Sequence, residues 1–169
     1  MNISKFDIFN NESYLESNYD PLYHNTSTYS FYYIIKDNIL KRSYHDNPFN
    51  NNKIKMISLS RNKNLDISYY NSLLDVVIEL DTNLLNKKYK IIPYDYFIHS
   101  NKEDKPKSNI NRKQPFEFEE IILNDINNII FYIISVNFKN YSIFNDRISE
   151  LLPFLKNKNI KIYNDGKLY

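Results

Sequence analysis

Three carboxylates gather at the start of an apolar run in residues 116–123, whose sequence is Phe-Glu-Phe-Glu-Glu-Ile-Ile-Leu. Alternate side chains of a strand share a face, so Glu117 and Glu119 would lie side by side, while Glu120 would point the other way. Carboxylates held close together repel each other. Such a pair is typical of a site for a cation, a ligand or a reaction in which positive charge develops. The alternative is an edge strand whose acidic face is solvated.

Two groups of polar side chains precede this acidic stretch. His24 and Thr26 fall in a short predicted strand, where His24 is able to donate a hydrogen bond to a ligand or to a neighbouring backbone group. Ser58 and Ser60 alternate with apolar residues, so both hydroxyl groups would share one strand face. Arg61 follows at once, and its planar guanidinium suits a pyrophosphate. The alternative is that these polar side chains are solvated or satisfied within the fold.

A long polar segment, residues 99–115, leads into the acidic stretch. A connection of this length without structure of its own is usually either functional or disordered. Its positive charges would suit an acidic target, nucleic acid included, and the alternative is a solvated loop. Tyr94, just before the segment, could stack on a flat ring, although core packing is the commoner use of tyrosine. The basic residues are Lys102, Lys105, Lys107, Arg112 and Lys113.

The composition limits the possible chemistry. The chain has 169 residues, a formal net charge of +2, 16 Tyr, a single Gly and no Cys. Without Cys there are no disulfides, thiol nucleophiles or thiolate metal ligands, and three scattered His give no metal-ligand spacing. The small net charge does not by itself indicate a nucleic-acid binder. With so little Gly, the turns must be built from Asn, Asp and Pro.

No apolar run approaches the ~20 residues of a membrane span, and the first residues do not resemble a signal peptide. We therefore expect a cytoplasmic protein without membrane association. If the chain is encoded by a phage, that cytoplasm is the host's, or the protein is packaged in the virion. Residues 1–20 are expected to form an N-terminal arm, and residues 21–169 a single domain.

Hydrophobic spacing places the elements that must position these polar groups. Residues 28–38 are predicted to form an amphipathic helix with Thr26, Ser27 or Thr28 as its N-cap, and residues 144–156 a second helix that Pro153 bends or shortens. Residues 83–86 form a short turn of helix. Strands are expected at 22–27, 39–41, 54–60, 75–81, 89–93, 116–123, 129–136 and 161–163. Residues 43–53 and 124–128 are predicted to be a loop and a turn.

Six to eight short strands and two or three helices predict an α+β fold with a mostly antiparallel sheet. The order of the polar groups along the chain resembles that of the ADP-ribosyltransferase superfamily. That superfamily carries a His or Arg on its first strand, a Ser or Tyr on a middle strand and a Glu before a late apolar strand. The chain is also similar to a group of phage and bacterial proteins with a Tyr-His-x-Thr-Ser start, here residues 23–27, and a Glu-x-Glu-Glu run, here residues 117–120.

The resemblance covers roughly residues 21–136. It implies a split, mostly antiparallel sheet with flanking helices and a cleft that binds NAD⁺ as a substrate, without a metal. Of the acidic residues, it implies that Glu119 is the catalytic carboxylate and Glu117 meets the acceptor group, with Glu120 as the rival for catalysis. The residues implied to contact NAD⁺ are His24, Thr26, Ser58, Ser60, Arg61 and Tyr94, and residues 99–115 take the place of a target-recognition loop. Asn25 stands where related sequences usually have Gly, and Asn tolerates the same left-handed backbone.

The resemblance thus implies NAD⁺-dependent ADP-ribosyl transfer to a protein or nucleic-acid target. Two other classes of protein compete with this prediction. One is a phage or virion-associated structural protein that keeps the fold without catalysis. The other is a nucleic-acid-binding module built on residues 99–115. Binding of NAD⁺ separates the transferase from both.

Overall fold

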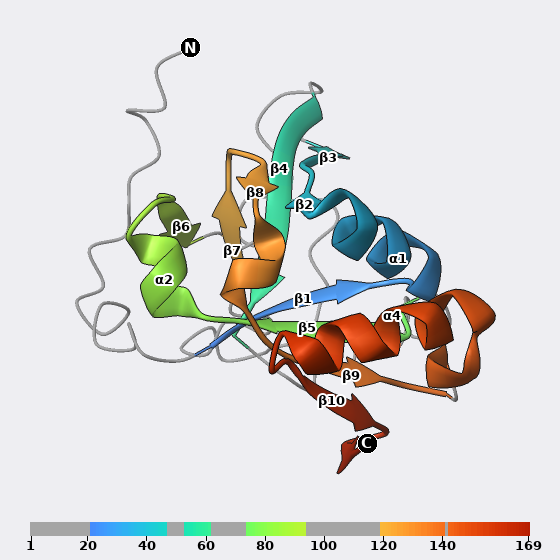
Figure 1. Ribbon diagram of the computed structural model, residues 1–169. Helices are drawn as coiled ribbons and strands as arrows, with labels where there is room; N and C mark the ends of the chain where they lie inside the picture. The colour runs from blue at the N-terminus through green and yellow to red at the C-terminus, as the bar shows by residue number, and fades with distance from the viewer. Residues whose placement is uncertain (1–20, 47–52, 62–73, 94–118, 141) are drawn as a thin grey trace, which may run out of the picture.

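A nine-stranded β-sheet organises the part of the chain that the structure describes (Figure 1). The computed structural model describes residues 21–46, 53–61, 74–93, 119–140 and 142–169. The strands of this sheet are β1 (Leu22–Thr26), β3 (Ser43–Asp46), β4 (Lys53–Ser60), β5 (Val76–Leu80), β6 (Ile91–Pro93), β7 (Glu119–Ile122), β9 (Ile133–Phe138), β10 (Lys161–Asn164) and β11 (Lys167–Leu168). Their order is β11-β10-β9-β5-β1-β4-β7-β6, and β3 pairs with β4 beside this path.

The pairing within the sheet is antiparallel except between β9 and β10, which run parallel. Parallel neighbours require a crossover connection, and the helix α4 (Asp146–Asn157) supplies it. A separate two-stranded sheet joins β2 (Ile39–Leu40) to β8 (Ile126–Asn127). Together with α1 (Thr28–Asp37) and α2 (Thr82–Asn86), these elements confirm the predicted α+β class with a mostly antiparallel sheet.

The helix α1 forms where its spacing and cap predict it. The Ser27 hydroxyl accepts a hydrogen bond from the Ser30 N–H and so caps the first turn. Phe31, Ile34 and Ile35 recur at helical spacing and are buried against the sheet. The helix stops at Asn38, whose left-handed backbone (φ 53°) turns the chain into β2.

The helix α4 continues past Pro153 to Asn157, so the proline does not shorten it. Proline removes the hydrogen bond to the carbonyl group four residues earlier, here that of Ser149. Both Pro153 and Ser149 are exposed, so water can replace the missing partner on this side of the helix. Ile148, Leu152 and Leu155 face the core and hold the helix in place.

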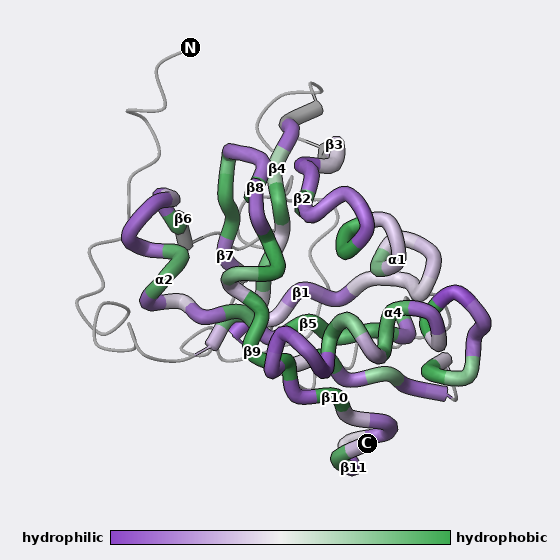
Figure 2. Tube along the Cα trace, in the orientation of Figure 1, coloured by the Kyte–Doolittle hydropathy of each residue, from purple (hydrophilic) through white to green (hydrophobic). Residues whose placement is uncertain are grey.

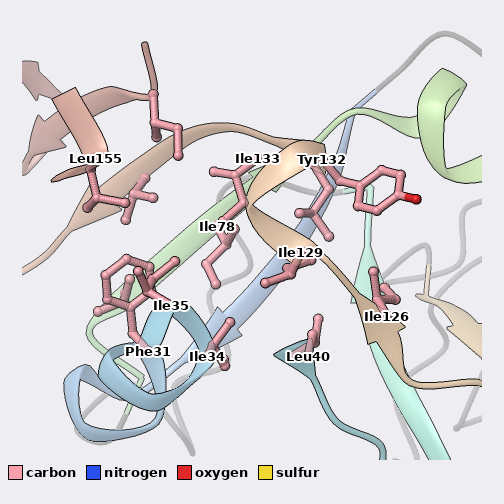
Figure 3. Packing of buried hydrophobic residues seen from close by; sticks show 14 of the residues in the cluster. Phe31, Ile34, Ile35, Leu40, Ile78, Ile126, Ile129, Tyr132, Ile133 and Leu155 are labelled. Atoms are coloured by element: carbon pink, nitrogen blue, oxygen red, sulfur yellow. The ribbon is translucent and has the colours of Figure 1, made fainter. Parts of the chain in front are cut away.

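One hydrophobic core joins the helices to the sheet. Figure 3 shows Phe31, Ile34 and Ile35 of α1 close to Ile78 of β5. Leu155 of α4 belongs to the same buried cluster. The Phe31 ring meets a ring of β9 edge to face, with centroids 5.4 Å apart. Figure 2 shows hydrophobic stretches on β5, β9 and α4 and hydrophilic stretches at the turns between elements.

The apolar run at 129–136 is not one strand. Its first half is a 3₁₀ turn, η3 (Ile129–Tyr132), and only then does β9 begin. Asn128 has a left-handed backbone (φ 57°), which starts the turn, and Ile129 and Tyr132 are both buried at a helical spacing. The Asp81 N–H donates to the Tyr132 carbonyl group over 2.8 Å, which fixes the end of the turn. A short apolar run does not reveal its period by composition alone.

Short polar strands account for the remaining differences. The predicted loop 43–53 contains β3, the predicted turn 124–128 contains β8, and β11 follows the last predicted strand, so the described residues form eleven strands where six to eight were expected. All three strands form by backbone pairing without alternating hydrophobicity, the signal on which strand prediction depends. The predicted arm at residues 1–20 lies outside the described residues.

Candidate functional site

The sheet divides between β1 and β4. Strand β1 pairs with β5 at five positions, from Leu22↔Leu80 to Thr26↔Val76, but with β4 at Tyr23↔Ser60 alone. Figure 1 shows β4 and β7 running steeply across the direction of β1, β5 and β9. One part of the sheet is therefore β11-β10-β9-β5-β1 and the other is β3, β4, β7 and β6, joined at a single register pair.

His24 lies directly at this division. Its Nδ1 atom is 3.1 Å from the backbone carbonyl oxygen of Ser58, so the side chain reaches from β1 to β4. A carbonyl oxygen only accepts hydrogen bonds, so Nδ1 carries the proton and donates. In the neutral ring this fixes Nε2 as the acceptor, and the ring is half-buried. The structure thus brings two of the predicted site residues, His24 and Ser58, together.

The register between β4 and β7 positions the acidic residues. Ser60 lies opposite Glu119, and Leu59 lies opposite Glu120. Residues opposite each other on neighbouring strands share a face, so Glu120 belongs to the face of Leu59, and Ser60 belongs to the other face of β4. Tyr23 extends the Ser60 row, and His24, one residue later, falls on the Glu120 face.

Arg61 and Glu120 form an ion pair across the two strands. Arg61 Nε donates to Glu120 Oε1, and Nη2 donates to Oε2 over 3.2 Å. Only 11% of the Arg61 side chain and 6% of the Glu120 side chain are exposed. Arg61 was expected to contact a pyrophosphate and Glu120 to compete for the catalytic role. In the structure, each of these side chains engages the other.

The remaining predicted site residues are either partly described or lie outside the described residues. Thr26 is buried at the end of β1, opposite Val76, and Ser58 is half-buried. Glu117, Tyr94 and the predicted target-recognition loop with Lys102, Lys105, Lys107, Arg112 and Lys113 lie outside the described residues.

The Ser60 row continues through residues that the sequence analysis did not single out. Tyr23 lies opposite Glu79 of β5, and Glu79 lies opposite Ser135 of β9. The Ser135 hydroxyl donates to the Glu79 carboxylate, and Ser135 is buried. The available signal was Glu79 itself, the one charged residue inside the apolar strand 76–80. Polar residues thus lie in register across five neighbouring strands, from Ser135 of β9 to Glu119 of β7.

The described residues hold no group of three His, Cys, Asp or Glu able to bind a metal ion. Within the same described part of the chain, no helix is long and apolar enough to cross a membrane. A shallow groove of about 330 Å³ lies between α1 and α4, lined by residues such as Tyr32, Lys36, Glu150 and Phe154. None of these is a predicted site residue, so the groove is separate from the candidate site.

Comparison with known proteins adds no family to this geometry. No protein-family model matches the chain, and no curated protein matches it.

Proposed function

We propose that this protein is an NAD⁺-dependent ADP-ribosyltransferase that acts on a macromolecular target. The observation that carries the proposal is the division between β1 and β4, where His24 reaches across to Ser58 and Ser60 lies opposite Glu119. Diverging strands leave backbone and side-chain groups of both strands able to face a ligand. The residues at this point are the ones that the resemblance assigns to NAD⁺.

Glu119 is the carboxylate to which we assign the chemistry. Breaking the bond between nicotinamide and ribose develops positive charge on the sugar, as in glycoside cleavage. A fixed carboxylate stabilises that charge and holds a ribose hydroxyl group. Glu120 is less suited to this role because Arg61 engages both of its oxygens and the pair is buried. Ser60 lies opposite Glu119 in the strand register, and we assign it the role of orienting that carboxylate.

The arrangement of faces restricts how NAD⁺ would bind. His24 and the Ser60 row belong to opposite faces of the sheet, so a ligand that contacts both must lie across the diverging edges of β1 and β4. An extended dinucleotide suits such a path better than a compact ligand does. With Nδ1 donating to Ser58, His24 would use Nε2 to accept a hydrogen bond from a ribose hydroxyl group.

The test follows radiolabelled NAD⁺ incubated with purified protein and a host-type lysate. We expect label to enter protein or nucleic acid with the wild type. The Glu119→Gln variant keeps the shape of the side chain and removes its charge, so kcat should fall by about 10²–10³-fold. Binding of NAD⁺ should change much less, since the charge acts mainly in the transition state.

Glu150→Gln, an exposed acid on α4, is the matched control and should leave the activity unchanged. Full activity of the Glu119→Gln variant would show that this carboxylate is not catalytic. Absence of NAD⁺ binding and turnover in the wild type would overturn the proposed function.

A further inference from the structure

The Arg61–Glu120 pair is the most buried ion pair among the described residues. The other two are Lys41–Asp37 and Arg42–Asp125, whose side chains are at least a third exposed. Taking two charges out of water is unfavourable unless the geometry compensates for the lost hydration. Here two hydrogen bonds join the guanidinium to both carboxylate oxygens, and such two-point pairing is the arrangement that best compensates.

This pair ties together the two strands that carry the candidate site. Arg61 follows directly after β4, and Glu120 is the second residue of β7. Glu120 lies opposite Leu59, so the carboxylate reaches diagonally along β4 to the residue two positions further on. The pair therefore fits only one register between β4 and β7.

The register matters because a slip of β7 by one residue would exchange the two faces of the strand. After such a slip Glu119 would no longer lie opposite Ser60. The apolar residues of β7 resist the slip only weakly. Ile121 and Ile122 are both buried, one on each face of the strand, and a slip would replace one isoleucine by the other.

We infer that Arg61 and Glu120 are positioning residues, which fix the register of β7 and so hold Glu119 opposite Ser60. For its catalytic consequence this inference rests on the proposed function. It replaces the expected contact between Arg61 and a pyrophosphate. The two roles differ in their kinetic signatures: loss of a ground-state phosphate contact raises KM, whereas misplacement of Glu119 lowers kcat.

The first experiment needs no enzymatic activity. Hydrogen exchange is measured on the full chain for the wild type, Arg61→Ala and Ser135→Ala. Ser135→Ala is the matched control, because it removes a buried hydrogen bond between β5 and β9, away from β7. In Arg61→Ala we expect the amides of Ile121 and Ile122 to exchange about 10²–10⁴-fold faster, the change that corresponds to breaking a buried ion pair. The amides of β5 should change little in Arg61→Ala, whereas Ser135→Ala should quicken exchange in β5 and leave Ile121 and Ile122 nearly unchanged.

The second experiment measures NAD⁺ turnover. Arg61→Ala should lower kcat by at least about tenfold with little change in KM. Arg61→Lys keeps the charge but not the two-point geometry, and should fall between the wild type and Arg61→Ala. The double variant Arg61→Met with Glu120→Leu replaces the pair by apolar side chains of similar size, which often restores stability. For a positioning pair, kcat stays low in the double variant even where stability recovers.

The results separate this inference from the proposed function. Unchanged exchange in β7 of Arg61→Ala overturns the inference, whatever the protein catalyses. Recovery of kcat together with stability in the double variant, or a raised KM with normal kcat in Arg61→Ala, also overturns it. Faster exchange confined to β7 in Arg61→Ala, together with a wild type that does not turn over NAD⁺, would support the positioning role of the Arg61–Glu120 pair and reject the proposed function.

Discussion

Burial separates the roles of two arginine–carboxylate pairs in this chain. Arg61 and Glu120 are almost fully buried, whereas the Arg42 and Asp125 side chains are 35% and 37% exposed. Breaking a buried pair typically costs about 3–5 kcal/mol, while an exposed pair contributes about 0–1 kcal/mol. The same chemical pair thus fixes a strand register in one place and secures a surface turn in the other.

Asp125 shows how the exposed pair responds to pH. Hydrogen bonds from the Arg42 backbone N–H and guanidinium lower the pKa of the Asp125 carboxyl group. The carboxylate therefore stays ionised in the folded chain at a pH where the unfolded chain takes up a proton. Its stabilisation is present above the usual aspartate pKa and is lost as the pH falls through the lowered value.

The prediction uses Asp125→Asn, which keeps the shape and the acceptor oxygen. The free energy of unfolding at neutral pH should fall by no more than about 1 kcal/mol, because solvent screens the pair. Urea unfolding of both proteins along a descending pH series should show this difference shrinking toward zero. A difference that grows in acid would contradict the assigned cause.

His24 allows its two ring nitrogens to be tested separately. His24→Asn keeps a donor near the Nδ1 position, and so the contact with the Ser58 carbonyl group, but has no atom at the Nε2 position. If Nε2 contacts a ribose hydroxyl group, KM for NAD⁺ should rise by about tenfold, the loss expected for one hydrogen bond, with kcat and thermal stability nearly unchanged.

His24→Gln serves as the matched variant, since its amide group reaches toward the Nε2 position and should recover part of the affinity. Unchanged KM in both variants would reduce His24 to a structural link between β1 and β4.

At the scale of elements, asparagine adopts the left-handed backbone that glycine adopts in most proteins. The described chain turns through left-handed backbone at Asn38, Asn128, Asn140, Asn159 and Asp165, and its single glycine, Gly166, follows the last of them. Asn159 ends α4 in a Schellman motif. The Asn159 N–H donates to the Lys156 carbonyl group, and the Ile160 N–H donates back to that of Leu155. Leu155 and Ile160 are both buried, which is the hydrophobic contact expected of the motif.

A substitution at Asn159 tests that cap. Asn159→Val places a β-branched side chain at a φ of 58°, so we expect a loss of about 1–2 kcal/mol in the free energy of unfolding. Asn159→Gly should be at least as stable as the wild type, because glycine accepts the left-handed backbone without a steric penalty. Denaturant unfolding measures both, and equal stability of the Val and Gly variants would exclude backbone strain as the controlling factor.

Sequence was sufficient for the elements that bury a regular apolar face. The spacing of Phe31, Ile34 and Ile35 predicted α1, and the apolar run at 76–80 predicted β5. It failed at β3, β8 and η3, where backbone pairing and the turn at Asn128 decide the structure. The site was accessible to sequence only as an order of residues. Register between distant strands is a tertiary property, and so the Arg61–Glu120 pair appears only in the fold.

At the scale of the whole molecule, the division of the sheet and the basic segment 99–115 address two different parts of the proposed reaction. The division is the proposed place for NAD⁺, and the basic segment would select the target. The net charge of +2 is small, so attraction of an acidic target depends on where the positive charges lie.

The prediction neutralises Lys105, Lys107 and Lys113 together, each changed to Gln. Transfer of ADP-ribose to the target should be lost, while hydrolysis of NAD⁺ survives. For a nucleic-acid target, the salt dependence of binding should also flatten by about 0.7–0.9 per lost phosphate contact. Both activities are compared at low and moderate salt.

The matched control neutralises Lys156, Lys158 and Lys161, three exposed lysines at the end of α4 and the start of β10, which changes the net charge equally. Equal loss of target labelling in the two triple variants would mean that overall charge, rather than this segment, attracts the target. Loss of both activities in the first variant alone would mean that the segment stabilises the proposed NAD⁺ site.

The central place of β1 in the sheet also bears on how the chain is made. This strand is the first of the described elements to leave the ribosome, yet its two neighbours, β4 and β5, come after α1, β2 and β3. Leu22 of β1 cannot pair until Leu80 of β5 has been made, and β5 in turn cannot pair with β9 until that strand has been made. Such long-range pairing slows folding and leaves strand edges uncovered during synthesis. Newly made chains should therefore pass through a stage in which β1 is unpaired and prone to aggregation, and in which chaperones have time to bind it.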